Sequence, residues 1–240
     1  MVRKYIPDTI TSLNLLCGVI GVVFAFGGRF DTAFYMMLAG AVFDFCDGLA
    51  ARALGAYSDM GRELDSLADV VTFGVLPSMM LMNLMKVCSF SESASLWCYV
   101  PLLIAVFSGL RLARFNVDER QHNGFIGLPT PACAVICGSL CCFVVFEPDG
   151  FLCSLVAGNV FVPVLSVVLS ALLVCGIPMF SMKFSRDDSR TLRMKRWLFA
   201  VNCALCAVIV LIVGLHWSLS VLLAFAVYIC MNVAFAILKV

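Results

Sequence analysis

The sequence has few charged residues. Lysine, arginine, aspartate and glutamate make up 13% of its 240 residues, whereas 62% of the residues are hydrophobic and the mean hydropathy is +1.04. A soluble globular domain has about 25% charged and about 45–50% apolar residues. This shortage of charge excludes an ordinary soluble domain and indicates an integral membrane protein. The net charge of only +1 gives no general attraction for nucleic acid, so no nucleic-acid partner is expected.

The sequence also lacks a long polar stretch, an internal repeat and a low-complexity tail. Its length is instead divided into apolar segments that approach the roughly 20 residues needed to cross a bilayer. We therefore expect an all-α fold, a polytopic membrane helical bundle of about eight transmembrane helices that forms a single domain over residues 1–240. The segments run over residues 9–28, 32–53, 59–86, 94–115, 129–147, 156–178, 194–213 and 216–238.

Basic residues are unevenly divided between the two sides of such a bundle. If the N-terminus is cytoplasmic and eight spans alternate, only Arg29 and Lys86 of the 16 lysines and arginines fall on the outer side. Because lysine and arginine concentrate in cytoplasmic loops, this bias predicts a cytoplasmic N-terminus.

Four aspartates interrupt the apolar pattern: Asp44, Asp47, Asp65 and Asp69. A charge at the centre of a bilayer costs about 2.5–3.5 kcal/mol, and neighbouring carboxylates also repel one another. Since each helical residue turns by about 100°, the first pair of aspartates shares a helix face, and the second pair, spaced by four, shares another. The loop between the two helices is short, so we expect antiparallel neighbours whose aspartate-bearing faces converge.

Convergent carboxylates without a histidine suit hard divalent cations such as Mg²⁺ or Mn²⁺. Two such cations would balance four carboxylates, and paired ions recurrently hold phosphate groups. Small residues on the same faces leave room for a bulky ligand, and Arg52 adds a cation suited to phosphate. The pattern therefore predicts a metal-bound phosphorylated substrate at the cytoplasmic membrane boundary. The small residues are Gly48, Ala51 and Gly61.

Two other interpretations of the aspartates are open. They could pair with Arg52, Arg62 or Arg111 and simply hold helices together. They could also line the ion path of an ion-coupled membrane transporter, where intramembrane carboxylates are common. Against a transporter, the aspartates lie near one membrane face, and the sequence shows no inverted repeat.

Residues 44–69 follow the pattern D-x2-D-G-x2-A-R-x8-G-x3-D-x3-D. The segment thereby resembles the CDP-alcohol phosphatidyltransferase family. This resemblance implies a helical membrane fold, usually a homodimer, in a bacterial inner membrane, with two metal ions and a CDP-linked lipid as donor. It implies metal ligands at Asp44, Asp47 and Asp65. It also implies that Asp69 is the general base and a further metal ligand, and that the CDP group is contacted by Gly48, Arg52 and Gly61.

The flanking sequence is similar to the phosphatidylserine synthase branch of that family. Thr11 and Asn14 belong to an N-terminal element in which Asp8 replaces the branch's usual asparagine. The other matching elements are Phe73-Gly74 with Pro77, Arg111-Leu-Ala-Arg114-Phe115-Asn116, Gly127-Leu-Pro129-Thr-Pro131-Ala132, and Pro178 to Lys183.

This second resemblance implies that the substrates are CDP-diacylglycerol and L-serine and the products phosphatidylserine and CMP. Thr11 and Asn14 are then expected to meet the CDP-lipid. Arg111 and Arg114 are expected to bind the carboxylate of the acceptor, as arginine suits that group, although anchoring at the cytoplasmic face would also explain them. Glycerol 3-phosphate, inositol phosphate and choline remain alternative acceptors.

Overall fold

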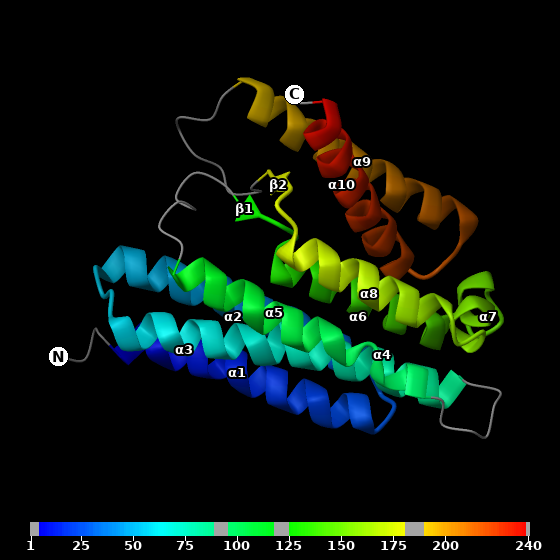
Figure 1. The fold of residues 1–240 in the computed structure, drawn as a ribbon, viewed down its shortest axis with the longest axis horizontal. Helices are drawn as coiled ribbons and strands as arrows, with labels where there is room; N and C mark the ends of the chain where they lie inside the picture. The colour runs from blue at the N-terminus through cyan, green and yellow to red at the C-terminus, as the bar shows by residue number, and fades with distance from the viewer. Residues whose placement is uncertain (1–4, 89–95, 118–124, 181–189, 239–240) are drawn as a thin grey trace.

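The computed structural model describes residues 5–88, 96–117, 125–180 and 190–238 (Figure 1). Within these ranges the chain is almost entirely helical, and the only sheet is an antiparallel pair of two-residue strands. The elements, in chain order, are α1 (Tyr5–Phe26), α2 (Phe30–Leu54), α3 (Asp59–Asp69), the π-helical segment η2 (Val70–Val75), α4 (Leu76–Cys88), the 3₁₀ turn η3 (Leu96–Tyr99), α5 (Leu102–Val117), β1 (Phe125–Ile126), α6 (Thr130–Phe146), α7 (Phe151–Ala157), α8 (Phe161–Val174), β2 (Pro178–Met179), α9 (Arg190–Val213) and α10 (Ser218–Leu238).

Among the described residues, six continuous helical stretches are long and apolar enough to cross a membrane, and the bent pair α6 and α7 supplies a seventh if it is counted as one span. The expected all-α membrane bundle is therefore confirmed, and each of the eight predicted segments contains a helix. The segment predicted at 156–178 yields only the 14-residue α8. Asn159, in the left-handed region at φ 58°, precedes this helix, and Gly176 and Pro178 follow it, so the helix is short at both ends.

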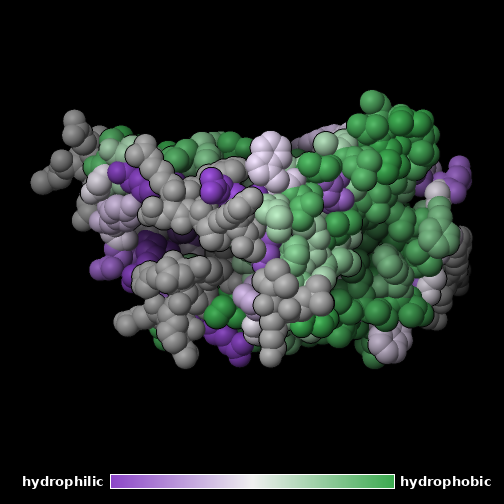
Figure 2. Space-filling view, turned by 90° about the horizontal axis from the view of Figure 1, so that it is seen from above, coloured by the Kyte–Doolittle hydropathy of each residue, from purple (hydrophilic) through white to green (hydrophobic). Residues whose placement is uncertain are grey.

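The pair α9 and α10 is set apart from the other helices (Figure 1). α1 packs along α2 and against α3, η2 and α4, while α6 packs against α2 and α4. α9 and α10 pair with each other at a steep angle to the rest, and α10 rests on α6 (Figure 1). Figure 2 shows hydrophobic residues over most of the length of the molecule and hydrophilic residues gathered near the end where α1 and α3 begin.

Three helices meet closely at Gly18, Gly40 and Thr72, a contact that we call the glycine waist. A Cβ atom at Gly18 would collide with the Thr72 side chain and lie 3.0 Å from its Cα atom. A Cβ atom at Gly40 would lie 2.7 Å from Thr72 Cγ2. The Thr72 hydroxyl also donates a hydrogen bond to the Asn14 carbonyl oxygen at 3.1 Å. The waist therefore sets the spacing of α1, α2 and η2 directly beside the aspartates.

The helix that carries the second aspartate pair widens into η2 immediately after Asp69. Pro77 has no N–H group, so the Phe73 carbonyl loses its usual helical donor, and the Leu76 N–H bonds instead to the Val71 carbonyl five residues earlier. A Cβ atom on Gly74, in the same segment, would lie 3.0 Å from Ser108 Cβ on α5. Gly74 thus allows α5 to approach the aspartate-bearing helix closely.

Candidate functional site

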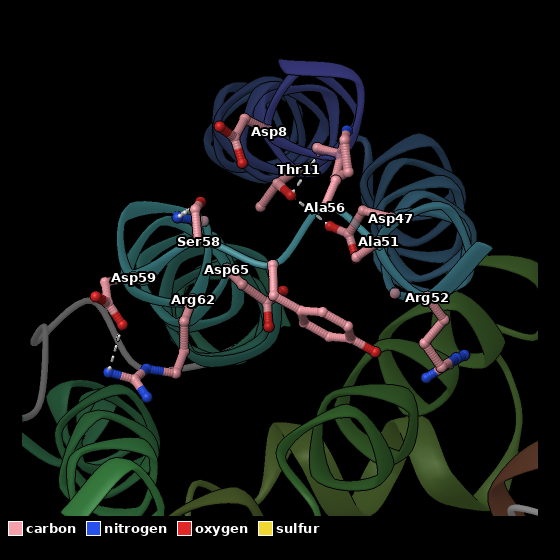
Figure 3. Close-up of a pocket in the computed structure, with 14 residues that line it drawn as sticks. Asp8, Thr11, Asp47, Ala51, Arg52, Ala56, Ser58, Asp59, Arg62 and Asp65 are labelled. Atoms are coloured by element: carbon pink, nitrogen blue, oxygen red, sulfur yellow. Dashed lines mark hydrogen bonds and ion pairs between the residues drawn. The ribbon is translucent and has the colours of Figure 1, made fainter. Parts of the chain in front are cut away.

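A cavity of about 600 Å³ opens between α1, α2 and α3, at the end of the molecule where hydrophilic residues gather (Figures 2 and 3). Figure 3 shows side chains from all three helices pointing into it, with Asp47 and Asp65 on opposite sides. Its lining residues are Pro7, Asp8, Thr11, Asp47, Gly48, Ala51, Arg52, Ala56, Tyr57, Ser58, Asp59, Gly61, Arg62 and Asp65.

A tight connection between α2 and α3 shapes the mouth of this cavity. Gly55 ends α2 in the left-handed conformation (φ 60°, ψ 32°), and its N–H bonds back to the last turn of the helix. Glycine adopts this conformation without the steric cost of a side chain. Ser58 then caps α3 by accepting a hydrogen bond from the Gly61 N–H at 2.9 Å. The chain therefore reverses direction within four residues, as the sequence predicted.

Asp44, Asp47 and Asp65 come together as the helical spacing predicted. One carboxylate oxygen from each lies within 4.8 Å of the others. At an effective dielectric constant of about 20, each such pair of ionised carboxylates repels by about 3.5 kcal/mol or more. Ligand oxygens around one Mg²⁺ ion lie about 3–4 Å apart, because each is bound at about 2.0–2.1 Å. A divalent cation therefore fits this cluster with little movement and would remove the repulsion.

Thr11 orders one of these ligands. Its hydroxyl lies 2.6 Å from Asp47 Oδ2 and 3.0 Å from the Pro7 carbonyl oxygen, and its single proton can serve only one acceptor at a time. The shorter contact goes to the carboxylate. Thr11 was predicted to contact the CDP-lipid; it does line the cavity, and it also orients Asp47.

Asp69 is not one of the three clustered carboxylates, although it interacts electrostatically with all of them. Its Oδ1 accepts a hydrogen bond from Asn14 Nδ2 at 3.4 Å. Asn14 is fully buried and is not among the cavity-lining residues, so its predicted contact with the CDP-lipid stays a prediction. Arg111, on α5, also interacts electrostatically with Asp69. Asp69 is therefore within electrostatic reach of both the carboxylate cluster and a buried arginine.

The arginines named in the sequence analysis differ in their exposure and in their ion pairs. Arg52 lines the cavity and is exposed, which leaves it accessible to a phosphate group. Arg62 forms ion pairs with Asp59 at 3.6 Å and Glu63 at 3.8 Å. Arg111 is only 8% exposed, whereas Arg114, one turn further along α5, is exposed. Lys183, in the late matching element, lies outside the described residues.

The two glycines predicted to contact CDP differ in their surroundings. A Cβ atom on Gly61 would lie 2.8 Å from Asp8 Oδ1 and 2.9 Å from Ser58 Oγ, so alanine there would displace one or both of these side chains. A Cβ atom on Gly48 would meet nothing closer than an Arg52 nitrogen at 3.9 Å. Protein packing gives no reason for glycine at that position, and the free space faces the cavity.

Sequence reasoning did not assign Tyr57, Ser58 or Asp8 to the site, although all three line the cavity. Ser58 directly before Asp59 is a helix N-cap signal that could have placed it at the start of α3. Tyr57 carries no comparable signal, because its position depends on how the reversal after Gly55 is folded.

Comparison with known proteins accounts for this arrangement. The family model of the CDP-alcohol phosphatidyltransferases matches residues 4–172. A protein of Methanocaldococcus jannaschii named CDP-diacylglycerol–serine O-phosphatidyltransferase is 31% identical over 230 residues, which cover 95% of this chain and 94% of that protein. Proteins of the same name from Mycobacterium leprae (34% identity, 98% of this chain, 75% of that protein) and Bacillus subtilis (39% identity, 53% of this chain, 70% of that protein) are also similar. The chain therefore belongs to the CDP-alcohol phosphatidyltransferase family.

Proposed function

We propose that this protein transfers the phosphatidyl group of CDP-diacylglycerol to the hydroxyl of L-serine, forming phosphatidylserine and releasing CMP. The observation that carries the proposal is the convergence of Asp44, Asp47 and Asp65 beside a cavity with room for a nucleotide, in a chain whose similar relatives bear the name of this activity. The relatives give no support to an ion-coupled transporter.

The binding end of the site holds the diphosphate. Two divalent cations, Mg²⁺ or Mn²⁺, are held by Asp44, Asp47 and Asp65 with a contribution from Asp69, and when bound they neutralise the charge of the diphosphate. Thr11 keeps Asp47 oriented toward the cluster. Arg52 adds a fixed positive charge at the cavity wall, and Gly48 leaves room for the CDP group.

The reacting end lies next to Asp69. This carboxylate accepts the proton of the serine hydroxyl, whose oxygen forms a new bond to the lipid-bearing phosphorus as the bond to CMP breaks. A general base must come within about 2.6–3.2 Å of the hydroxyl, directly or through one water. Asn14 holds Asp69 in place from α1. Arg111 and Arg114 receive the carboxylate of serine, as guanidinium groups can do with two parallel hydrogen bonds.

We place the protein in a bacterial inner membrane with this site on the cytoplasmic face. Arg52 and Arg62 lie at the cavity end of the helices, whereas Arg29 and Lys86 lie at the opposite ends of α2 and α4, which agrees with the usual concentration of basic residues in the cytoplasm. Residues 1–240 act as one domain, and two copies form a homodimer. The molecular mass of the purified protein in detergent, corrected for bound detergent, tests the dimer.

One assay tests the reaction. Purified protein receives CDP-diacylglycerol and, separately, L-serine, glycerol 3-phosphate, inositol phosphate or choline, and CMP release is measured. We expect release with serine, its loss on chelation of divalent cations, and its return with Mg²⁺ or Mn²⁺. Release with another acceptor but not with serine would replace serine with that acceptor. No release with any of them would refute the transferase proposal.

A further inference from the structure

Two contacts join α5 to the continuous helix formed by α3 and η2. Gly74 of η2 meets Ser108 of α5, where a Cβ atom added to the glycine would lie 3.0 Å from Ser108 Cβ. Eight residues before Gly74 and eight residues after Ser108, Asn116 Nδ2 donates a hydrogen bond to Ser66 Oγ at 2.9 Å. Equal steps in opposite directions are what two antiparallel helices require. The contacts therefore mark the two ends of one interface, about two helical turns apart.

Asp69 and Arg111 lie between these two contacts along the helices. Asp69 comes three residues after Ser66, and Arg111 comes three residues after Ser108. The two side chains also interact electrostatically across the interface. The interface therefore spans both the proposed general base and a residue proposed to receive the carboxylate of serine.

The hydrogen bond of Asn116 lies in the last turn of α5, which ends at Val117. Among the described residues, α5 packs along η2, α4 and α8 rather than along α3. A helix end opens readily where little packing holds it. The bond between Asn116 and Ser66 therefore ties the end of α5 to α3.

Ser66 is well prepared to accept this bond. Its own hydroxyl donates to the Arg62 carbonyl oxygen one turn earlier, at 3.1 Å. Since a hydroxyl has a single proton, the Ser66 oxygen then offers only lone pairs, which suit the amide of Asn116. Ser66 also directly follows Asp65, one of the clustered carboxylates. The bond thus joins α5 to the helix that carries the proposed metal ligand.

We propose that Asn116 is a positioning residue whose hydrogen bond to Ser66 sets the spacing of α5 and α3 where serine binds. The inference rests on the proposed function. Serine must present its hydroxyl to Asp69 on α3 and its carboxylate to the arginines of α5, so its binding depends on this spacing. The cavity proposed for CDP-diacylglycerol lies between α1, α2 and α3, so the binding of the lipid does not depend on it.

Asn116→Ala and Ser66→Ala remove the same hydrogen bond from its two sides. We expect each to raise the KM for serine by about two- to tenfold, the effect of losing one neutral hydrogen bond, and to leave the KM for CDP-diacylglycerol unchanged. Ser66→Thr keeps the hydroxyl and should keep the KM for serine.

Ser12→Ala is the matched control for Ser66→Ala. The Ser12 hydroxyl also donates to the carbonyl oxygen four residues earlier, that of Asp8, at 2.8 Å. Ser12 is exposed on α1 and does not line the cavity. This variant should therefore change neither KM.

The double variant separates positioning from the other roles that Asn116 could have. Because both alanine substitutions break one bond, the second should add little to the loss in kcat/KM for serine. If Asn116 touched serine directly, Ser66→Ala would keep the KM for serine and the two losses would add. If the bond only stabilised the fold, both KM values would rise together and the thermal unfolding temperature would fall. Either pattern would overturn the inference.

The proposed function and this inference fail in different ways. If the unaltered protein releases no CMP with serine, the proposed function is wrong and the inference falls with it. If it does release CMP and both alanine variants keep the KM for serine, only the positioning role is wrong. An alanine variant that no longer folds would likewise count against positioning and in favour of a structural role for the bond.

Discussion

At its N-terminal end α1 borders an open cavity through Thr11, whereas two turns later its Gly18 is pressed against Thr72. α2 shows the same contrast, with Gly40 packed into the waist and Gly48 facing free space. The same residue type therefore serves two purposes within a few turns. At the waist glycine lets helices approach one another, and beside the cavity it leaves space that no protein atom fills. Substitutions can separate these two purposes.

The largest expected effect is on the cavity side. Asp65→Ala removes one of three converging carboxylates, and we expect turnover to fall by about a thousandfold or more while the thermal unfolding temperature is kept or rises, because the repulsion among these carboxylates is reduced. CMP release and thermal unfolding in detergent measure both. Glu63→Ala is the matched control on the same helix, since the Glu63 side chain is 61% exposed and does not line the cavity, and it should matter little. Full turnover in Asp65→Ala would exclude the proposed metal site.

Asp69 lies on the border between the two regions, because its partner Asn14 also accepts the hydrogen bond of Thr72 at the waist. Asp69→Asn keeps the size of the side chain but cannot take a proton. We expect turnover to fall by about a hundredfold or more, with binding of CDP-diacylglycerol retained. Single-turnover CMP release combined with equilibrium binding of the lipid separates the two effects. Robust turnover would remove Asp69 from the role of base.

At the waist the expected loss is one of stability. Gly18→Ala forces a methyl group onto Thr72, and overpacking of this kind costs about 1–3 kcal/mol of unfolding free energy. Gly109→Ala is the matched control on α5, where an added Cβ atom meets nothing within 4 Å and alanine should stabilise the helix by about 0.5–1 kcal/mol. Thermal unfolding of the two variants should therefore shift in opposite directions. Equal shifts would mean that the waist is not tightly packed.

Gly48→Ala should change substrate binding and leave stability unaffected. The nearest protein atom would lie 3.9 Å from the added methyl group, so the fold should be unaffected or slightly more stable. If the space belongs to the CDP group, the KM for CDP-diacylglycerol should rise, by about tenfold if the methyl group displaces the ligand. An unchanged KM together with an unchanged unfolding temperature would show that nothing occupies this space during the reaction.

The contrast also explains how far the sequence could predict the molecule. The apolar segments predict the helices, and helix geometry alone predicts that Asp65 and Asp69, four residues apart, share a helix face. The predicted convergence of Asp44, Asp47 and Asp65 is confirmed. The hydrogen bond from Thr11 to Asp47 joins residues 36 positions apart, and no local pattern specifies it. The π-helical segment after Asp69 depends both on the missing N–H of Pro77 and on the packing of Gly74 against Ser108. Of these two causes, only the missing N–H of Pro77 can be predicted from the sequence.

The smallest expected effect concerns Asp8, which lines the cavity and stands where the matching branch usually has asparagine. Its Oδ1 would lie 2.8 Å from a Cβ atom at Gly61, so the side chain already fits closely and an amide of the same shape should fit equally well. Asp8→Asn removes a negative charge near the place proposed for a diphosphate. A partly exposed charge of this kind is worth about 0.2–1 kcal/mol, so the KM for CDP-diacylglycerol should fall by about 1.4- to fivefold, and the decrease should shrink as salt is added. A rise in KM would mean instead that the carboxylate itself binds the nucleotide or a cation, and that the substitution of aspartate for asparagine extends the cavity's ligand set beyond the three clustered carboxylates.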